Sequence, residues 1–327
     1  MPYVSPLSQM FPGTPAYTEK DMPEDLSTKV YLVTGANTGV GKEVARILYS
    51  KNAVVWVAAR NEEKAQNAIQ SIKEAYPSST GRLEFLQLDL SDLATIKASA
   101  EKFLAKENRL DVLFNNAGVM FPPHGSKSAQ GYELQLGTNN LGHFLFTQLL
   151  TPVMIETAKV APKDSVRVLW VASSAAELLI PVAGGVDLDN LDYKRDIFYA
   201  YKYGVSKAGN YYHSTEYARR HRDDGIVSVA MNPGNLRSEL YRNCGFFESL
   251  VSKAVTYPPV NGAYTELFAG LSDEVTMEKS GCWIVPWGRF GDIAPALLLG
   301  SKPESEGGTG IAQKFWDWSE EQTKSFA

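Results

Sequence analysis

The chain has 327 residues, of which 44% are hydrophobic and 21% are charged, as in an ordinary globular protein. This composition excludes a disordered or collagen-like chain. Two cysteines, Cys244 and Cys282, are too few for a disulfide-rich secreted protein. The 32 basic and 37 acidic residues give a net charge of −5, which argues against a general nucleic-acid-binding protein.

The sequence also bears on the cellular compartment. No run reaches the roughly 18 apolar residues that a membrane span needs. The first basic residue is Lys20, whereas a signal peptide begins with a basic region. We therefore expect a soluble cytoplasmic protein with no membrane span. None of the four histidines stands in a metal-binding motif, so no metal site is expected.

Residues 1–28 differ from the rest, because they hold five prolines and show no hydrophobic periodicity. They predict an irregular N-terminal arm, which either packs on the domain surface or stays mobile. One domain is predicted over 29–300. Residues 301–327 are predicted to form a C-terminal helix, because Phe315, Trp316 and Trp318 give it an apolar face.

From Lys29 onward, short apolar runs alternate with helix-length segments, as in SDLATIKASAEKFLAK, where Ser91 is the expected N-cap and Asp92 the first-turn acid. The runs lack a polar face, which is typical of parallel strands covered on both sides. They cover residues 29–35, 53–59, 83–89, 110–118, 165–174, 226–234 and 282–288. This order predicts an α/β fold: a single Rossmann-type, doubly wound parallel sheet of about seven strands, with helices on both faces. Ligands are then expected at the carboxyl ends of the strands.

The first strand ends in Thr-Gly-Ala-Asn-Thr-Gly-Val-Gly over residues 34–41, and a helix follows. Glycines here let the backbone turn tightly and approach a pyrophosphate, which the N–H groups of the helix N-terminus can bind. The spacing is TGxxxGxG and not GxGxxG. A dinucleotide site is the favoured interpretation, and a purely structural turn is the alternative.

The second strand ends at Arg60, where an NAD site usually carries an acidic residue for the ribose 2′-hydroxyl. The planar guanidinium suits a 2′-phosphate instead, which favours NADP(H). Alternatively, Arg60 is a solvated charge at the start of a helix. Asp89, at the end of the third strand, could accept a hydrogen bond from the adenine amine or could cap a turn.

Tyr203 and Lys207 form the one YxxxK pair of the chain, within a helical segment between two predicted strands. Residues four apart share a helix face, and an ammonium beside a phenol favours its ionised form. Such a tyrosine can pass a proton to a carbonyl oxygen. Ser174 ends the fifth strand, where its hydroxyl could bind the same oxygen. Ser173 points the other way if the strand is regular.

These residues together resemble the short-chain dehydrogenase/reductase family. TGANTGVG, Asn115-Asn116-Ala117-Gly118, Asn139, Ser174, the Tyr203/Lys207 pair and Pro233-Gly234 occur in the family's order, over about residues 29–290. The phrase Asn139-Asn140-Leu-Gly-His-Phe and the long gap from Ser174 to Tyr203 resemble retinol-dehydrogenase-like and WW-domain-oxidoreductase-like members. The arm ending in YTEKDMPEDLSTKVYLVTG resembles that of fungal members, many of which modify secondary metabolites.

The resemblance implies a role for each matching residue. Tyr203 is the general acid/base, Lys207 binds the nicotinamide ribose and lowers the pKa of the tyrosine, and Ser174 polarises the carbonyl. Asn139 holds a water that joins Lys207 to a proton relay. His143 is expected to be a helix packing residue. The implied NADP(H) contacts are Gly35, Asn37, Thr38, Gly39, Val40, Gly41, Arg60, Asn61, Asp89, Leu90, Asn116, Ala117, Gly118, Tyr203, Lys207, Pro233, Gly234, Leu236 and Ser238.

Aromatic residues gather over 237–300. In the resembled fold this stretch is expected to form the far wall of the pocket and a substrate lid at about 237–270. They favour a large hydrophobic carbonyl compound, unless most of them belong to the core. The group comprises Tyr241, Phe246, Phe247, Tyr257, Tyr264, Trp283, Trp287 and Phe290.

The expected function is NADP(H)-dependent hydride transfer between nicotinamide and a hydrophobic ketone or alcohol, such as a secondary-metabolite intermediate. Two alternatives stay open: an NADP(H)-binding protein of this fold that does non-redox chemistry or acts as a regulator, and a reductase of an activated C=C bond. A homodimer through the helices near 131–158 and 199–223 is common in the family, but the C-terminal helix could cover that surface instead.

Overall fold

The computed structural model describes residues 1–237 and 256–327. Its centre is one eight-stranded sheet in the order β3-β2-β1-β4-β5-β6-β7-β8. The strands are β1 (Val30–Thr34), β2 (Val54–Ala59), β3 (Arg82–Gln87), β4 (Val112–Asn115), β5 (Arg167–Val171), β6 (Val227–Met231), β7 (Trp283–Val285) and β8 (Arg289–Gly291). The first seven are parallel and β8 is antiparallel to β7. The predicted doubly wound parallel sheet is confirmed, and β8 extends it by one short strand.

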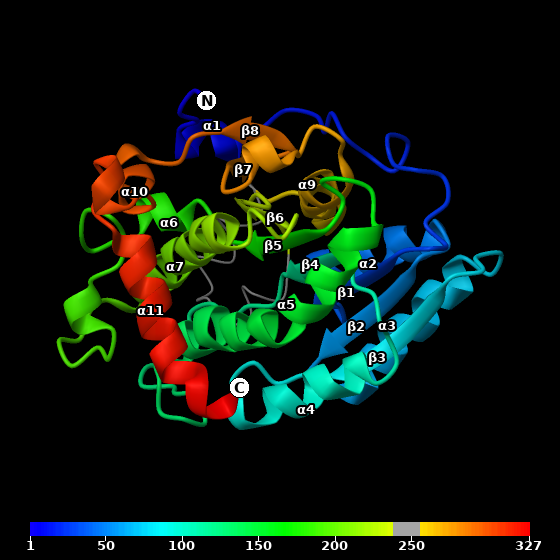
Figure 1. Ribbon diagram of the computed structural model, residues 1–327, viewed down its shortest axis with the longest axis horizontal. Coiled ribbons are helices and arrows are strands. Elements are labelled where there is room, and N and C mark those ends of the chain that lie inside the picture. The colour runs from blue at the N-terminus through cyan, green and yellow to red at the C-terminus, as the bar shows by residue number, and fades with distance from the viewer. Residues whose placement is uncertain (238–255) are drawn as a thin grey trace.

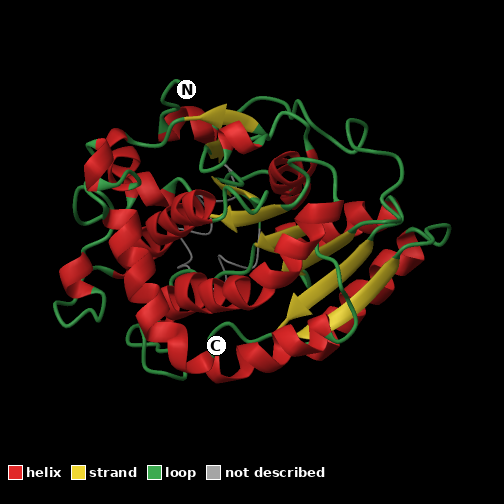
Figure 2. Ribbon diagram, in the orientation of Figure 1, coloured by secondary structure: helices red, strands yellow, loops and turns green. Residues whose placement is uncertain are grey.

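Helices cover both faces of the sheet and give three layers (Figures 1 and 2). One hydrophobic core lies between the sheet and α4 (Leu93–Leu104), α5 (His143–Val160), α7 (Tyr199–Arg220) and α11 (Ile311–Thr323). The other lies beneath α2 (Gly39–Ser50), α3 (Glu62–Ala75) and α9 (Pro259–Leu271). Central strands such as β1 and β5 are buried along their whole length, which is why their sequences lack a polar face. No helix in the described ranges is both long and apolar enough to cross a membrane.

The helix starts follow local capping chemistry, with one correction to the sequence analysis. Asn61 caps α3, since its side-chain oxygen accepts a hydrogen bond from the Lys64 backbone N–H at 2.8 Å. For α4 the N-cap is Asp92 and not Ser91, because Asp92 accepts from the Ala94 N–H at 3.1 Å. The Ser91 hydroxyl instead donates to the Asp89 carboxylate at 2.6 Å.

The strand order reverses direction beside β1, because β2 pairs with one edge of β1 and β4 pairs with the other. The connections from β1 and β4 therefore leave toward opposite faces. Their carboxyl ends diverge and leave a crevice, which is the usual ligand site of an open α/β sheet.

The C-terminal helix α11 packs across α5 and α7 (Figure 1). Phe315 stacks on His213 of α7 with ring centroids 4.8 Å apart, and Trp316 meets Phe144 of α5 edge to face at 4.8 Å. The side chains of Phe315 and Trp316 are both buried. This helix therefore belongs to the hydrophobic core on that face of the sheet.

The N-terminal arm packs at the edge of the sheet that β8 forms. Within it, α1 (Pro6–Met10) is capped by Ser5, whose hydroxyl accepts a hydrogen bond from the Ser8 N–H. Tyr3 pairs with Asp292 next to β8, and Figure 1 shows α1 beside this strand. Of the two alternatives for the arm, packing on the domain describes this structure. Short helices α6 (Ala175–Leu178) and α10 (Pro295–Gly300) lie on the same side of the molecule.

Candidate active site

A cleft of about 690 Å³ lies at the carboxyl ends of β1, β2, β4, β5 and β6. It holds most of the residues that the sequence assigned to a cofactor site. These are Gly35, Asn37, Thr38, Gly39, Val40, Arg60, Asn61, Asp89, Leu90, Asn116, Ala117, Gly118, Pro233, Gly234 and Leu236. Ser174, Tyr203 and Lys207 line the same cleft. The structure therefore brings the expected cofactor and catalytic residues together.

The glycine-rich turn forms the floor of the cleft. Gly35 has a φ of +71°, a left-handed conformation that favours glycine. A Cβ at Gly41 would lie 2.5 Å from Asn116 Nδ2, so α2 can approach β4 this closely only with glycine there. Gly41 supports the turn from behind and is outside the cleft lining.

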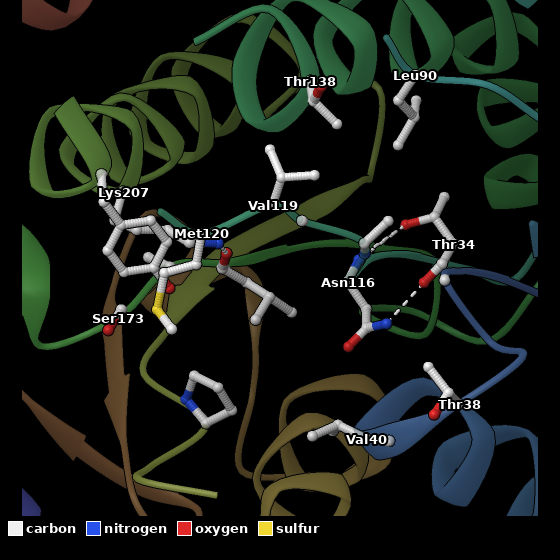
Figure 3. A pocket seen from close by; sticks show the side chains of 18 of the residues that line it. Thr34, Thr38, Val40, Leu90, Asn116, Val119, Met120, Thr138, Ser173 and Lys207 are labelled. Atoms are coloured by element: carbon white, nitrogen blue, oxygen red, sulfur yellow. Dashed lines mark hydrogen bonds between the residues drawn. The ribbon is translucent and has the colours of Figure 1, made fainter. Parts of the chain in front are cut away.

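Thr34 and Asn116 fix the turn against β4. Asn116 Nδ2 donates to the Thr34 carbonyl at 2.6 Å, and the Asn116 and Ala117 N–H groups donate to the Thr34 hydroxyl at 3.0 and 2.9 Å (Figure 3). His143 Nε2 also lies 3.0 Å from this hydroxyl. Burial lowers the pKa of His143 to about 3, so its ring is neutral and serves as a hydrogen-bonding core residue.

The end of the cleft beyond β2 is lined by two basic residues. Arg60 is exposed there, and Lys64, in the first turn of α3, lines the same end. The end of β2 carries no carboxylate, because its last residues are Ala58 and Ala59, and the acidic residues Glu62 and Glu63 of α3 do not line the cleft. Asp89 lies across the cleft and accepts hydrogen bonds from the Ser91 N–H and hydroxyl, at 2.9 and 2.6 Å. Its turn-capping role is thus present, and it also lines the cleft.

Ser174, Tyr203 and Lys207 meet at the opposite end. Ser174 is the N-cap of α6, and both Ser174 and Tyr203 are buried. The Lys207 ammonium lies 5.7 Å from the centroid of the Tyr203 ring and donates to the Val171 carbonyl at 2.9 Å. The four-residue spacing therefore does place both groups on one helix face. Ser173 also lines the cleft, near Lys207 in Figure 3, because the chain leaves β5 at Val171 and the strand alternation ends there.

Asn139 lies behind the cleft wall and is fully buried. It belongs to a π-helical segment, η1 (Leu136–Gly142), which leads into α5. Its side chain accepts from the Val119 N–H at 2.9 Å and donates to the Val119 carbonyl and to the Ser206 hydroxyl, both at 3.0 Å. Asn139 thus joins the extension of β4 to the helix that carries Tyr203 and Lys207.

Asn140, next in the π-helical segment, reinforces the same helix. It donates to the Ser206 carbonyl and to Asn210 Oδ1, each at 2.8 Å, and Asn210 in turn donates to the Val171 carbonyl at 3.0 Å. The carbonyl that accepts from Lys207 is therefore held from two sides. The sequence showed Asn140 only as part of a family phrase, and nothing in it pointed to Asn210.

Charge at this end of the cleft is set by burial. Burial lowers the pKa of Lys207 to about 8, and the carboxyl group of Glu266 on α9 opposes this shift. Burial likewise raises the pKa of Glu266 to about 8, against the opposing field of Lys207. Neither carboxyl oxygen of Glu266 has a hydrogen-bond partner among the described residues. Sequence reasoning missed Glu266, because a lone acid in an apolar helix gives no motif.

The wall near Tyr203 is mainly apolar, and the sequence did not single out its residues. Val119, Met120, Phe121, Leu178 and Leu179 line it. The Phe121 ring packs edge to face on Tyr203 at 5.5 Å and on Tyr199 at 5.2 Å. Tyr199 therefore supports the pocket wall indirectly. A short apolar stretch directly after the Asn-Ala-Gly motif is the signal that could have indicated part of this wall.

Of the lid expected at 237–270, the structure describes residue 237 and residues 256–270. Ser238, Tyr241, Phe246 and Phe247 lie outside the described residues. The described aromatic residues of this group, contrary to the pocket-wall interpretation, pack in the body and do not line the cleft. Trp287 packs on Tyr257 at 5.0 Å, and Phe290 on Phe268 at 5.4 Å. They pack inward because β7, β8 and α9 form a layer that needs its own apolar contacts.

Comparison with known proteins agrees with this geometry. A family model described as short chain dehydrogenase matches residues 29–184. A short-chain dehydrogenase/reductase of Phomopsis amygdali is 56% identical over 324 residues, which cover 98% of this chain and 96% of that protein. The short-chain dehydrogenase/reductase bet4 of Neocamarosporium betae is 48% identical, over 99% of this chain and 94% of that protein.

Two solved structures share the fold. The crystal structure of an uncharacterised protein from Mycobacterium paratuberculosis is 27% identical, covers 95% of this chain and 98% of its own, and superposes with a TM-score of 0.68. Pseudomonas aeruginosa RhlG, solved with NADP, is 24% identical over 80% of this chain and 95% of its own, with a TM-score of 0.63, and it shows the fold alone.

Fold and site define an α/β oxidoreductase with its cleft at the carboxyl edge of the sheet. The chain belongs to the short-chain dehydrogenase/reductase family, as the sequence resemblance predicted.

Proposed function

We propose that this oxidoreductase uses NADP(H) to transfer a hydride between the nicotinamide and a hydrophobic ketone or alcohol. One observation carries the proposal. A proton donor, Tyr203, and its neighbouring ammonium, Lys207, stand at one end of a continuous cleft whose other end holds the glycine-rich turn and Arg60. A dinucleotide laid along this cleft has its phosphates at the turn and its reactive ring near Tyr203.

The residues present suit such a cofactor. Gly39 and Val40, at the N-terminus of α2, line the cleft, where the N–H groups of the helix can bind a pyrophosphate. Arg60 and Lys64 place two cations where a 2′-phosphate would lie, and an exposed carboxylate that would repel it is lacking at Ala58 and Ala59. This charge pattern favours NADP(H) over NAD(H).

The chemistry then follows from the side chains. When bound, the reduced nicotinamide supplies the hydride. Tyr203 donates its hydroxyl proton to the carbonyl oxygen of the substrate, and Ser174 donates a hydrogen bond to the same oxygen. Lys207, held by the Val171 carbonyl, keeps a positive charge beside the phenol and favours the phenolate that remains. In the oxidation direction, Tyr203 takes the proton back from the alcohol.

Asn139 acts on this machinery from behind. Its bonds to Val119 and Ser206 hold the cleft wall and the Tyr203 helix at a fixed spacing. We assign Asn139 the role that the family resemblance implies, in which it holds a water that joins Lys207 to a proton relay, and its position behind the cleft wall supports this assignment.

The substrate class is proposed from the apolar wall around Tyr203. Met120, Phe121 and Leu178 offer apolar surface and few polar partners, so a hydrophobic carbonyl compound gains most from binding there. The secondary-metabolite intermediate expected from fungal relatives belongs to this class.

The test is a screen of purified protein with NADPH or NADH against hydrophobic ketones, matched alcohols and activated enones, following absorbance of the reduced nicotinamide. We expect NADPH-dependent reduction of ketones to alcohols, with the product identified by mass spectrometry. Reduction of the C=C bond of the enones with no action on ketones would instead support an alkene reductase. Cofactor binding with no turnover in any arm would contradict the redox proposal.

A further inference from the structure

Gln9, in the N-terminal arm, connects the two walls of the catalytic end of the cleft. Its side chain is 1% exposed, which is unusual for a glutamine in an otherwise exposed arm. Its amide nitrogen donates to the Val4 carbonyl and to the Glu177 carboxylate, each at 2.8 Å. Its amide oxygen accepts from Asn232 Nδ2 at 2.8 Å. One buried amide therefore satisfies partners from three segments.

The two distant partners of Gln9 flank catalytic elements. Glu177 lies on α6, the helix that Ser174 caps. Asn232 directly precedes Pro233 and Gly234, which line the cleft, and its side-chain oxygen accepts from the Gly234 N–H at 3.0 Å. Gln9 thus bridges the start of the Pro-Gly loop to the helix that follows Ser174.

Further contacts fix the arm on either side of Gln9. The Trp287 indole N–H donates to the Gly13 carbonyl at 3.0 Å, and the Asp292 N–H donates to the Pro2 carbonyl at 2.9 Å. The other oxygen of Glu177 accepts from the Ala294 N–H at 2.8 Å. The arm is therefore joined to β8, α6 and the Pro-Gly loop at once.

This anchoring decides where Met10 lies. Met10 follows Gln9 and lines the cleft. Because Gln9 is bonded between Glu177 and Asn232, its neighbour is held at the Ser174 and Pro233 end, and not at the Arg60 end. The neighbouring apolar residues of the arm differ, since Leu7 is 68% exposed and Phe11 is 60% exposed. Met10 is thus the arm residue that faces the reacting end.

We propose that the N-terminal arm is part of the active site, in which Gln9 is a positioning residue for the Pro233-Gly234 loop and Met10 is a specificity-determining wall of the substrate pocket. The substrate part of this assignment rests on the proposed function. Methionine is flexible and polarisable, so it adapts to an apolar substrate without a fixed shape. Changing its volume changes the room beside Tyr203 and leaves the proton donor in place.

The Met10 part is tested with two ketones of different bulk, cyclohexanone and 2-decalone, and NADPH. Met10→Trp should lower the ratio of kcat/KM for 2-decalone over cyclohexanone at least about fivefold, and Met10→Ala should raise it, because a pocket wall discriminates by volume. Leu7→Ala, in the same helix but exposed, is the matched control and should keep the wild-type ratio. The same ratio in all four proteins overturns the role of Met10.

The Gln9 part is read from NADPH affinity, measured by fluorescence titration without a ketone. Gln9→Leu keeps the approximate volume but leaves Glu177 and Asn232 without their bridge, and we expect about tenfold weaker NADPH binding. Leu7→Ala should bind as the wild type does. A purely structural Gln9 would lower the melting temperature and leave NADPH affinity unchanged, which would overturn the positioning role. Gln9→Glu, which keeps the size of the side chain, is titrated in the same way if Gln9→Leu does not fold.

The two proposals fail separately. A wild-type protein that binds NADPH but reduces neither ketone contradicts the hydrophobic-ketone function, and the Gln9 titration still decides whether the arm belongs to the site. If the wild type is active, the Met10 variants keep its kcat/KM ratio and the Gln9 variant keeps its NADPH affinity, the proposed function stands. The proposal that the arm belongs to the active site is then rejected.

Discussion

Glu266→Gln should change how the stability of the protein depends on pH. Glu266 lies on α9 between Gly262, whose Cβ position faces Leu236 and Val40, and Gly270, which faces Phe114 and Leu169. Since these residues are four apart, the Glu266 side chain points toward the sheet beneath the cleft. It is fully buried, and its pKa is raised by burial from 4.5 to about 8.

The sign follows from proton binding. Between pH 4.5 and about 8 the folded protein keeps the Glu266 proton and the unfolded chain releases it. The contribution of Glu266 to the free energy of unfolding is therefore largest below pH 4.5. Above this pH it falls by about 1.4 kcal/mol for each pH unit, until Glu266 ionises in the folded protein as well. Between pH 5 and pH 7 this group alone removes about 3 kcal/mol of the free energy of unfolding. Glutamine has no such proton, so the decline should disappear in Glu266→Gln.

The assay is urea denaturation of both proteins at pH 5, 6 and 7. We expect the variant to gain about 3 kcal/mol relative to the wild type between the two ends of this range, while titrating groups that do not interact with Glu266 cancel in the difference. Glu274→Gln is the matched control, because Glu274 is exposed just past the end of α9. A difference between wild type and Glu266→Gln that stays constant with pH would refute the reasoning.

Three further predictions concern the cleft. Tyr203→Phe should reduce turnover by about 10²–10⁴-fold and leave NADPH affinity nearly unchanged, because only the proton source is lost; an active variant would direct attention to Tyr199, beyond the Phe121 ring. Arg60→Glu should reverse a preference for NADPH of about tenfold to a hundredfold, and equal titration curves for NADPH and NADH in the wild type would reject the phosphate contact. Lys207→Ala should weaken NADPH binding as well as turnover. The affinity of the wild type for NADPH should also fall as the pH rises through about 8, because the buried Lys207 ammonium loses its proton there. The same pH profile in Lys207→Ala would argue against this cause.

Much of the fold could be predicted because each strand carries its own signal. The run at 53–59 is apolar on both faces since both faces of β2 are covered, and the chain enters α3 directly after it at a capping residue, Asn61. The glycine-rich turn could also be predicted from the sequence, because close packing at Gly41 leaves no room for a side chain and glycine is needed there. The Tyr203/Lys207 pair needed only helical spacing and a place between two strands.

Other features depend on contacts between distant residues, which local patterns do not encode. Ser91 and Asp92 are both good caps, and the choice of Asp92 follows from the bond that Ser91 makes to Asp89. The role of Gln9 depends on partners 168 and 223 residues away. The three-residue strand β8 is too short for a periodic pattern and forms because β7 offers it a free edge.

The position of α11 has a consequence for self-association of the protein. A second subunit that docked on α5 and α7 would have to displace Phe315 and Trp316 from a surface to which they are tethered. A tether keeps its end at an effective concentration that free subunits seldom reach, so the intramolecular partner wins the competition. We therefore expect the full chain to sediment as a monomer at micromolar concentration. A chain shortened after Ser301 would expose His213 and Phe144, and we expect it to self-associate.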